Sequence, residues 1–151
     1  VNFQDMCVAH GFPNGVTLSD DNRFLYVATR NGIMQYDLLN NTSIFLKKPS
    51  GIVDSRLDGL AYYKGTLVGN QPFRKRIIQY FLDEKKHSIV SQRILEANHP
   101  MFDQPTTGEI TDGNFIYLAN AQMQNGFQDG IIKSTEELDS IRLFRVKLFN
   151  Q

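Results

Sequence analysis

Two stretches of the chain match each other at a constant separation of 44 residues. Gly15-Val16-Thr17-Leu18 corresponds to Gly59-Leu60-Ala61-Tyr62, and Ile33-Met34-Gln35-Tyr36 corresponds to Ile77-Ile78-Gln79-Tyr80. The matched segments alternate with a period of two residues, which is typical of strands and excludes the helical repeats of similar length. A unit of about 40–50 residues with this alternation is the period of a four-stranded propeller blade.

Each unit is expected to form short strands between turn sequences. The expected strands are 16–19, 24–29, 33–38 and 43–47 in the first unit, and 60–63, 66–70, 76–82 and 88–95 in the second. A third unit has expected strands at 107–110, 115–120 and 141–149, interrupted by an insert at 121–140. Asn31-Gly32 separates two apolar runs, so we predict a type I′ turn there, with positive φ at both residues.

The sequence therefore predicts an all-β protein, a β-propeller arc of about three four-stranded antiparallel blades from a ring of six. The blades are expected at about 14–50, 57–98 and 105–149, the last without its outer strand, and 1–9 as an outer strand of the preceding or closing blade. Three blades cannot close a ring, and open sheet edges favour aggregation. We therefore expect upstream residues or a second chain to supply the missing half of the propeller.

The charge balance bears on possible partners. Sixteen Lys and Arg residues balance sixteen Asp and Glu residues, so no global field favours nucleic acid or an anionic membrane. The chain contains no signal-peptide pattern and no apolar stretch near the ~20 residues that span a bilayer. A small molecule is the expected partner. Neither these features nor the single cysteine, Cys7, indicates a cellular compartment.

Three residues are expected to converge at the mouth of the central channel, because each precedes the glycine that opens a blade. They are Asn14, Asp58 and Thr107. Amide and carboxylate oxygens suit Ca²⁺ better than zinc or another transition metal. Pro-Asn-Gly and Asp-Gly are also ordinary turn sequences, so spacing leaves both interpretations open.

The stretch Gly11-Phe12-Pro13-Asn14-Gly15-Val16-Thr17-Leu18-Ser19-Asp20 and its continuation to Tyr26-Val27-Ala28 resembles a segment shared by paraoxonases, strictosidine synthase-like proteins and SMP-30/gluconolactonases. Leu57-Asp58-Gly59-Leu60 lies where these families carry a second conserved acidic position. The resemblance implies that Asn14 and Asp58 are Ca²⁺ ligands. It also implies that the other ligands, and the histidines thought to act as bases, belong to the half of the ring that this chain lacks.

Other polar residues are expected to line the substrate pocket. They are Thr107, Asn70, Asn120 and Gln122, the last in the insert 121–140, which we expect to overhang the pocket. None of His10, His87 and His99 has a convincing base-and-orienter arrangement. His87 is expected to be exposed in a hairpin loop. The catalytic residue is therefore not identified, and an ion pair with a neighbouring blade is the expected role of Glu109.

We expect a calcium-dependent hydrolase of esters or lactones, in which the ion polarises the carbonyl group. One alternative is a non-catalytic propeller that serves as a binding or scaffold module, because one fold hosts many functions. Another is a metal-independent enzyme of the strictosidine synthase type, for which Glu109 is the candidate acid.

Overall fold

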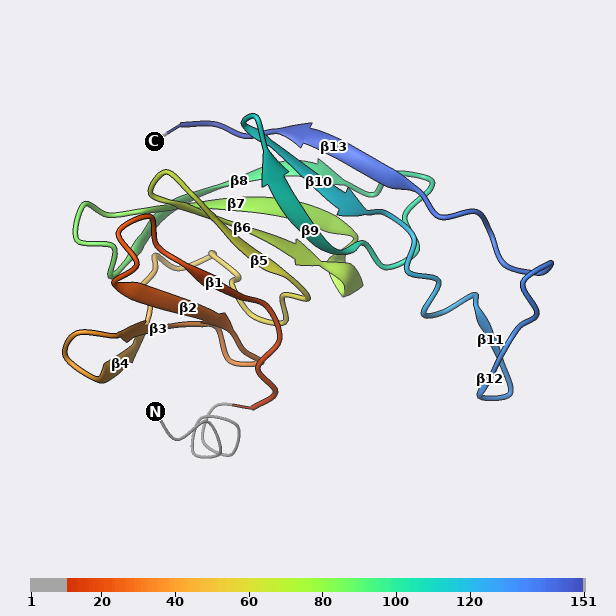
Figure 1. Ribbon diagram of the computed structural model, residues 1–151, viewed down its shortest axis with the longest axis horizontal. Coiled ribbons are helices and arrows are strands. Elements are labelled where there is room, and N and C mark those ends of the chain that lie inside the picture. Colours follow the sequence, from red (N-terminus) through yellow and green to blue (C-terminus); the bar gives the residue numbers. More distant parts are fainter. Residues whose placement is uncertain (1–10, 151) are drawn as a thin grey trace.

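The computed structural model describes residues 11–150, which form three antiparallel sheets placed side by side (Figure 1). The first sheet has the strand order β1 (Val16–Leu18), β2 (Phe24–Ala28), β3 (Ile33–Asp37) and β4 (Thr42–Phe45). The second has the order β5 (Leu60–Tyr63), β6 (Thr66–Gln71), β7 (Arg76–Leu82) and β8 (Ile89–Ala97), with the short helix η1 (Pro72–Arg74) between β6 and β7.

The third sheet consists of β9 (Thr106–Thr111), β10 (Asn114–Leu118) and β13 (Leu143–Lys147), in the order β13-β10-β9. The insert carries a small hairpin of β11 (Phe127–Gln128) and β12 (Ile131–Ile132). This arrangement confirms the all-β propeller arc, with a third blade that has three strands in the described part of the chain. The expected outer strand at 1–9 lies outside the described residues.

The blades stack because alternate residues of each strand face opposite neighbours. On β6 and β7, Leu67, Ile78 and Tyr80 pack towards the first blade, whereas Val68 and Ile77 pack towards the third. All six residues of β6 are buried, since both faces of the middle blade are covered. The innermost strands β1, β5 and β9 are neighbours in space, which brings the loops that precede them together.

Glycine is required where two innermost strands meet. A Cβ atom on Gly15 would lie 2.4 Å from the backbone nitrogen of Leu60, and one on Gly59 would lie 2.9 Å from Cα of Thr107. Such backbone contacts leave no room for a side chain. The glycine that opens each of the first two blades therefore sets how closely the next blade approaches.

Type I′ geometry occurs at other turns than the one predicted. Both central residues have positive φ at Lys64-Gly65 (44° and 78°) and at Asp112-Gly113 (48° and 70°). At Asn31-Gly32 only Gly32 has positive φ, so the type I′ prediction there is wrong. The reason is Thr29, whose backbone NH and hydroxyl both donate to Gly32 O and close a longer connection.

Two glutamines at equivalent repeat positions connect neighbouring blades. Gln35 of β3 donates from Nε2 to the carbonyl oxygen of Lys86, in the second blade. Gln79 of β7, 44 residues later, donates to Phe149 O at 2.8 Å and accepts from Phe149 N at 3.1 Å. Both side chains are buried. The repeated glutamine therefore makes a polar connection from each of the first two blades to the next.

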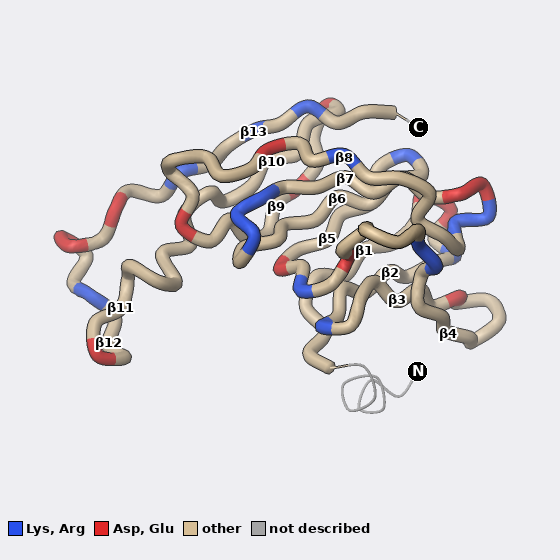
Figure 2. Tube along the Cα trace, turned by 180° about the vertical axis from the view of Figure 1, so that it is seen from behind, with Lys and Arg blue, Asp and Glu red and all other residues tan. Residues whose placement is uncertain are grey.

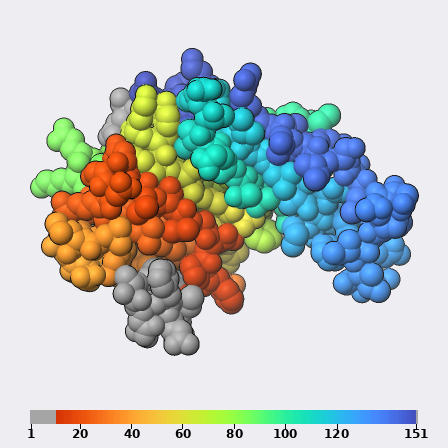
Figure 3. Space-filling model, viewed as in Figure 1, coloured from red at the N-terminus to blue at the C-terminus, as the bar shows by residue number. Residues whose placement is uncertain are grey.

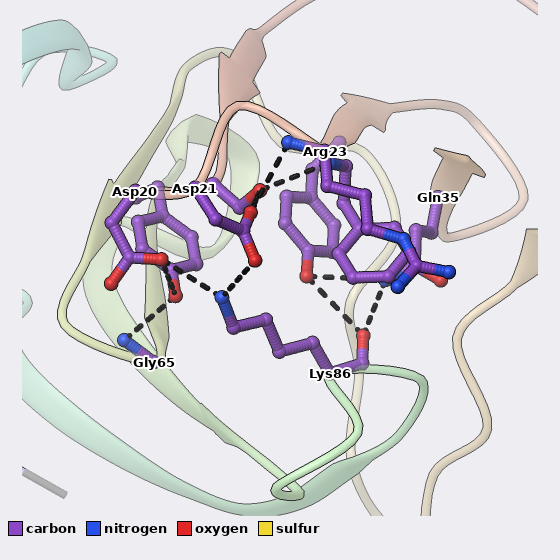
Figure 4. A network of polar contacts seen from close by, with 10 residues as sticks. Asp20, Asp21, Arg23, Gln35, Gly65 and Lys86 are labelled. Carbon is purple, nitrogen blue, oxygen red and sulfur yellow. Dashed lines mark hydrogen bonds and ion pairs between the residues drawn. The ribbon is translucent and has the colours of Figure 1, made fainter. Parts of the chain in front are cut away.

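The β7–β8 hairpin docks on the first blade through Lys86 (Figure 4). The Lys86 ammonium pairs with Asp20 at 2.8 Å and Asp21 at 3.1 Å. Burial of the ammonium group lowers the pKa of Lys86, but the hydrogen bonds to the two carboxylates raise it. The net effect is a raised pKa. His87 is half-buried rather than exposed as predicted, because Nδ1 bonds Gln35 Oε1 and the ring packs edge-on against Phe24.

The insert forms a lobe that protrudes beyond the three sheets (Figure 3). Its hairpin exposes Ile131 and Ile132, with 73% and 64% of their surface accessible. Among residues 11–150, helical structure is limited to η1, which leaves no helix that could cross a bilayer.

Candidate functional site

The candidate site lies where the chain enters β1, β5 and β9. The backbone NH of Asn14 donates to Ala28 O, and that of Asp58 donates to Asn70 O, each at 2.9 Å. Because both bonds join the entry loop to the end of the second strand of the same blade, Asn14 and Asp58 occupy equivalent positions. The fold thereby aims both side chains at the shared mouth of the channel.

Asn14 and Asp58 are in direct contact. The side-chain amide of Asn14 donates to Asp58 Oδ1 at 2.6 Å, and Asn14 is exposed while Asp58 is half-buried. The hydroxyl of Thr106 donates to the other carboxylate oxygen, Oδ2. The Asp58 carboxylate, in the second blade, is therefore contacted by one residue of the first blade and one residue of the third.

Thr106, rather than Thr107, holds the third equivalent position. Gly108 pairs with Tyr117, but Thr106 pairs with the next residue, Leu118, so Thr107 is the extra residue of a β-bulge. The bulge shifts the correspondence by one residue and leaves the Thr107 side chain exposed. Counting back from the blade glycine could not reveal this shift, so Thr106 was missed at the third equivalent position. Thr107, which was predicted to line the pocket, lines a cavity between β1, β5 and β9.

Asn70 supports the site from below. Its Nδ2 donates to Thr106 O at 2.9 Å, while its Oδ1 is fully buried and lacks a hydrogen-bond partner. An unpaired buried oxygen is costly, and here it lies next to the entry to β5, 3.3 Å from where a Cβ atom of Gly59 would stand. Asn70 therefore lies behind the site, fully buried, where it holds Thr106 near Asp58, and it is not among the residues that line the cavities there.

The residues present fit part of a calcium site. Asn14, Asp58 and Thr106 offer only oxygen donors, which is the chemistry that Ca²⁺ prefers. Six to eight oxygens are the usual complement, and in residues 11–150 no group of three or more histidine, cysteine or acidic side chains is assembled. The described arc therefore supplies one wall of such a site, with a single carboxylate.

Asn120 and Gln122 lie at the base of the insert. Asn120 donates to Ser140 O and accepts from Arg142 N, and the Gln122 amide makes both of its bonds to the Asp139 backbone. These bonds join the two ends of the insert. The structure therefore does not bring either side chain to Asp58, although Ala121 and Met123 next to them do reach the mouth.

The mouth itself is a cavity of about 630 Å³ whose wall is largely apolar. Asn14, Asp58 and Thr106 form its floor and also line a second cavity, between β1, β5 and β9, that continues into the channel. The wall above the floor is made by entry loops and by η1, and its principal residues are Phe12, Arg30, Arg56, Leu57, Phe73 and Met123. Of these wall residues, Phe12 and Arg56 could have been found from the sequence, because they are separated by the same 44 positions as the repeat.

No histidine of the described chain lines either cavity. His87 is held between blades, and the ring of His99 packs edge-on against Phe144 at 4.6 Å. Glu109 lines the channel cavity, where Oε1 accepts from Ile110 N, and no ion pair of Glu109 is formed within residues 11–150. The expected interblade ion pair of Glu109 is therefore absent from the described part of the chain.

Comparisons with known proteins support the fold. No family model and no curated protein matches this chain. Among solved structures, it is similar to the calcium-binding protein regucalcin from Agrobacterium tumefaciens, with a TM-score of 0.58, 14% identity and 94% of this chain covered. It is also similar to the PQQ-bound aldose sugar dehydrogenase from Streptomyces coelicolor (TM-score 0.57, 9% identity, 91% covered) and a luciferin-regenerating enzyme (0.55, 15%, 93%).

The matches cover 49%, 43% and 48% of those three chains. This chain therefore spans about half the length of the structures it resembles. At these identities the likeness extends to the fold, and the fold is an arc of a β-propeller of the kind found in regucalcin and in the sugar dehydrogenase.

Proposed function

We propose that this propeller arc supplies one side of the Ca²⁺ site of a hydrolase that acts on esters or lactones. The observation that carries the proposal is the meeting of Asn14, Asp58 and Thr106, one from each blade, on the floor of a largely apolar cavity. The regucalcin structure similar to this chain belongs to a protein described as calcium-binding, which supports the choice of ion.

When bound, Ca²⁺ would polarise an ester or lactone carbonyl group and stabilise the negative charge that develops on its oxygen. Asn14 and Asp58 would hold the ion through their side-chain oxygens. Thr106 would keep the Asp58 carboxylate in place, as Asn70 keeps Thr106 in place. Leu57 and Phe73 would exclude water from the apolar part of the substrate. The remaining ligands and the base are assigned to chain outside this arc.

The test is hydrolysis of a panel of lactones and aryl esters by the full-length protein, with calcium and with excess EDTA. Asp58→Asn keeps the shape of the side chain but removes its charge, and is expected to lower calcium-dependent activity at least ~100-fold if the ion stabilises the oxyanion. Asp129→Asn makes the same change in the β11–β12 turn and should leave activity unchanged. Equal activity with and without EDTA, or no hydrolysis of any member, would overturn the proposal.

A second candidate, a non-catalytic binding module, is favoured by one observation. Both carboxylate oxygens of Asp58 are already engaged by donors, Oδ1 by Asn14 and Oδ2 by Thr106. This candidate predicts that every ester and lactone in the panel stays intact and that calcium does not raise the melting temperature of the full-length protein, because an ion that bound the native state would stabilise it.

A further inference from the structure

The three entry loops share an unusual backbone conformation. Phe12, Arg56 and Gln104 each stand two residues before the site residue of their blade, and each has a positive φ, of 38°, 57° and 54°. Residues other than glycine rarely adopt positive φ, and persist there where the surrounding structure holds them. The same conformation at the same position in three blades directs three side chains to one place.

That place is the mouth cavity, since all three residues line it. Phe12 and Phe73 leave 74% and 73% of their surfaces exposed there. Single exposed apolar side chains are ordinary, but an apolar patch that is contiguous and rimmed by polar residues marks a binding surface. Together with Leu57 and Met123 they give the cavity an apolar side.

The same cavity carries unpaired positive charge. Arg30 and Arg56 line it, and neither forms an ion pair with any residue of the described chain. The guanidinium of Arg30 lies over the Phe12 ring, 5.6 Å from its centroid. Asp54, a buried acid two residues before Arg56, is engaged by Lys48 and by the backbone NH of Ile33.

A smaller cavity continues this surface through Arg56 and Phe73 to Arg74. In Figure 2 the connection between β6 and β7, which includes Arg74, is a continuous basic segment. Among the described residues, the acidic residue that lines the mouth cavity is Asp58, on its floor and already bonded to Asn14 and Thr106, and no acidic residue lines the smaller cavity. The rim is therefore positive, although the whole chain is neutral.

We infer that the mouth binds a small amphipathic carboxylate, an apolar or aromatic body that carries one negative charge. The body would lie against Phe12, Phe73 and Met123, and the carboxylate would reach Arg30 and Arg56, whose planar guanidinium groups suit it. Resting on the proposed function, this assigns the substrate class as esters or lactones that bear an anionic group at a distance from the scissile bond.

Binding is tested apart from hydrolysis, with a matched pair of probes in EDTA. Isothermal titration calorimetry of the full-length protein compares 4-phenylbutyrate with the neutral 4-phenylbutyramide, which has the same shape. We expect the carboxylate to bind about ten-fold more tightly at low salt, equivalent to about 1.4 kcal/mol. The preference should shrink at about 0.5 M NaCl, because exposed charges are screened. Equal affinity for both probes, or no binding of either, would overturn the inference.

Three variants locate the effect. Arg30→Gln/Arg56→Gln should abolish the preference for the carboxylate, whereas Lys85→Gln, the same change of charge in the β7–β8 hairpin, should preserve it. Arg56→Gly removes the side chain and places glycine at a positive φ that it adopts without strain, so the fold should keep or gain thermal stability while the preference falls. A preference that survives in both arginine variants would place the anion elsewhere and refute the assignment.

These measurements contain no calcium and no cleavable bond, so they fail or succeed independently of the proposed hydrolase activity. Hydrolysis then tests the link between the two. If the protein cleaves esters, an aryl ester with an anionic acyl chain should have a higher kcat/KM than its neutral counterpart, and Arg30→Gln/Arg56→Gln should remove that difference. A mutant that keeps the difference would show that the mouth is not the substrate-binding surface.

Discussion

Asn14 donates a hydrogen bond of 2.6 Å to Asp58 Oδ1, and the two residues lie one repeat of 44 positions apart. The contact joins the entry loops of two neighbouring blades at the channel mouth. Since a repeat places equivalent residues around one axis, an interaction between equivalent positions occurs only where the blades converge. The candidate site and the close approach of the first two blades are therefore the same feature of the fold.

The closeness of this pair makes Asn14→Asp a sensitive probe of the proposed ion. Two carboxylates at this separation repel each other, so the variant should melt at a lower temperature than the wild type in EDTA. Calcium should then raise its melting temperature by more than that of the wild type, because calcium affinity increases with the number of charged ligands. Thermal unfolding of the full-length protein at several calcium concentrations measures both effects.

Magnesium is the control for that titration. Because Mg²⁺ requires a smaller site with strict octahedral geometry, it should raise the melting temperature of the variant less than calcium does. A destabilised Asn14→Asp protein that calcium fails to rescue would show that Asn14 and Asp58 bind no ion between them.

Gly15→Ala should destabilise the protein by about 1–3 kcal/mol, the usual range for overpacking. Its Cβ atom would lie 2.4 Å from Leu60 N and 2.6 Å from Gly59 C, and backbone atoms cannot move aside as a flexible side chain can. Denaturant unfolding gives the change in free energy. Gly51→Ala is the comparison, because its Cβ atom would meet nothing within 4 Å and only its φ of 91° is unfavourable. An equal or smaller loss in Gly15→Ala would refute the steric explanation.

The glutamine connections between blades predict a matched pair of effects. Gln79→Leu removes the bonds of Gln79 to Phe149 N, Phe149 O and the Thr66 hydroxyl, of which the hydroxyl keeps its bond to Tyr63 O. It should cost about 2–4 kcal/mol, since a buried group left unpaired costs about 1–3 and Phe149 is only half-buried. Gln35→Leu should cost a similar amount, by removing the partner of Lys86 O and His87. Gln124→Leu, in the exposed part of the insert, should change stability by less than about 0.5 kcal/mol.

Hydrogen exchange adds a readout of position to that experiment. Gln35→Leu should speed exchange in the β7–β8 hairpin, and Gln79→Leu should speed it near the end of β13, because each variant loosens the following blade. Uniform changes over all three blades would contradict a local connection.

Much of the fold could be predicted because the repeat is written in local patterns. Alternation predicted β7 at Arg76–Leu82 and β5 at Leu60–Tyr63 to the residue. The type I′ turn predicted at Asn31-Gly32 is wrong because the side-chain hydroxyl of Thr29 donates to the carbonyl oxygen of Gly32. Such a bond depends on the rotamer of one residue, which the alternation of apolar residues does not encode.

The site was predicted in part for a related reason. Asn14 and Asp58 precede glycines that the repeat aligns directly, whereas the bulge at Thr107 displaces the third position by one residue. Gln122 was assigned to the pocket because the insert was expected to fold over the mouth, but its amide is used within the insert. The position of an irregular segment such as the insert depends on contacts that do not repeat along the sequence, so a repeat pattern cannot predict it.

Acid should weaken the contact between the first two blades. The Ser19 hydroxyl and the Lys86 ammonium lower the pKa of Asp21 from 3.8 to about 2. A carboxyl whose pKa is lower in the folded state stabilises that state above the unfolded value, and this stabilisation is lost as the pH falls through the folded value. The loss therefore falls between about pH 4 and pH 2. Asp21 is about half exposed (49%), so solvent screening keeps it small.

Asp21→Asn should flatten the dependence of unfolding free energy on pH within this window and leave its slope above pH 5 unchanged. Asp37, whose pKa is also lowered, chiefly by Arg23, keeps part of the dependence in the variant. Asp129→Asn, which alters an exposed carboxylate in the β11–β12 turn, is the control and should retain the wild-type profile. Denaturant titrations at half-unit pH steps resolve the difference, and identical profiles for Asp21→Asn and the wild type would show that the bonds of Asp21 to Ser19 and Lys86 do not stabilise the folded state.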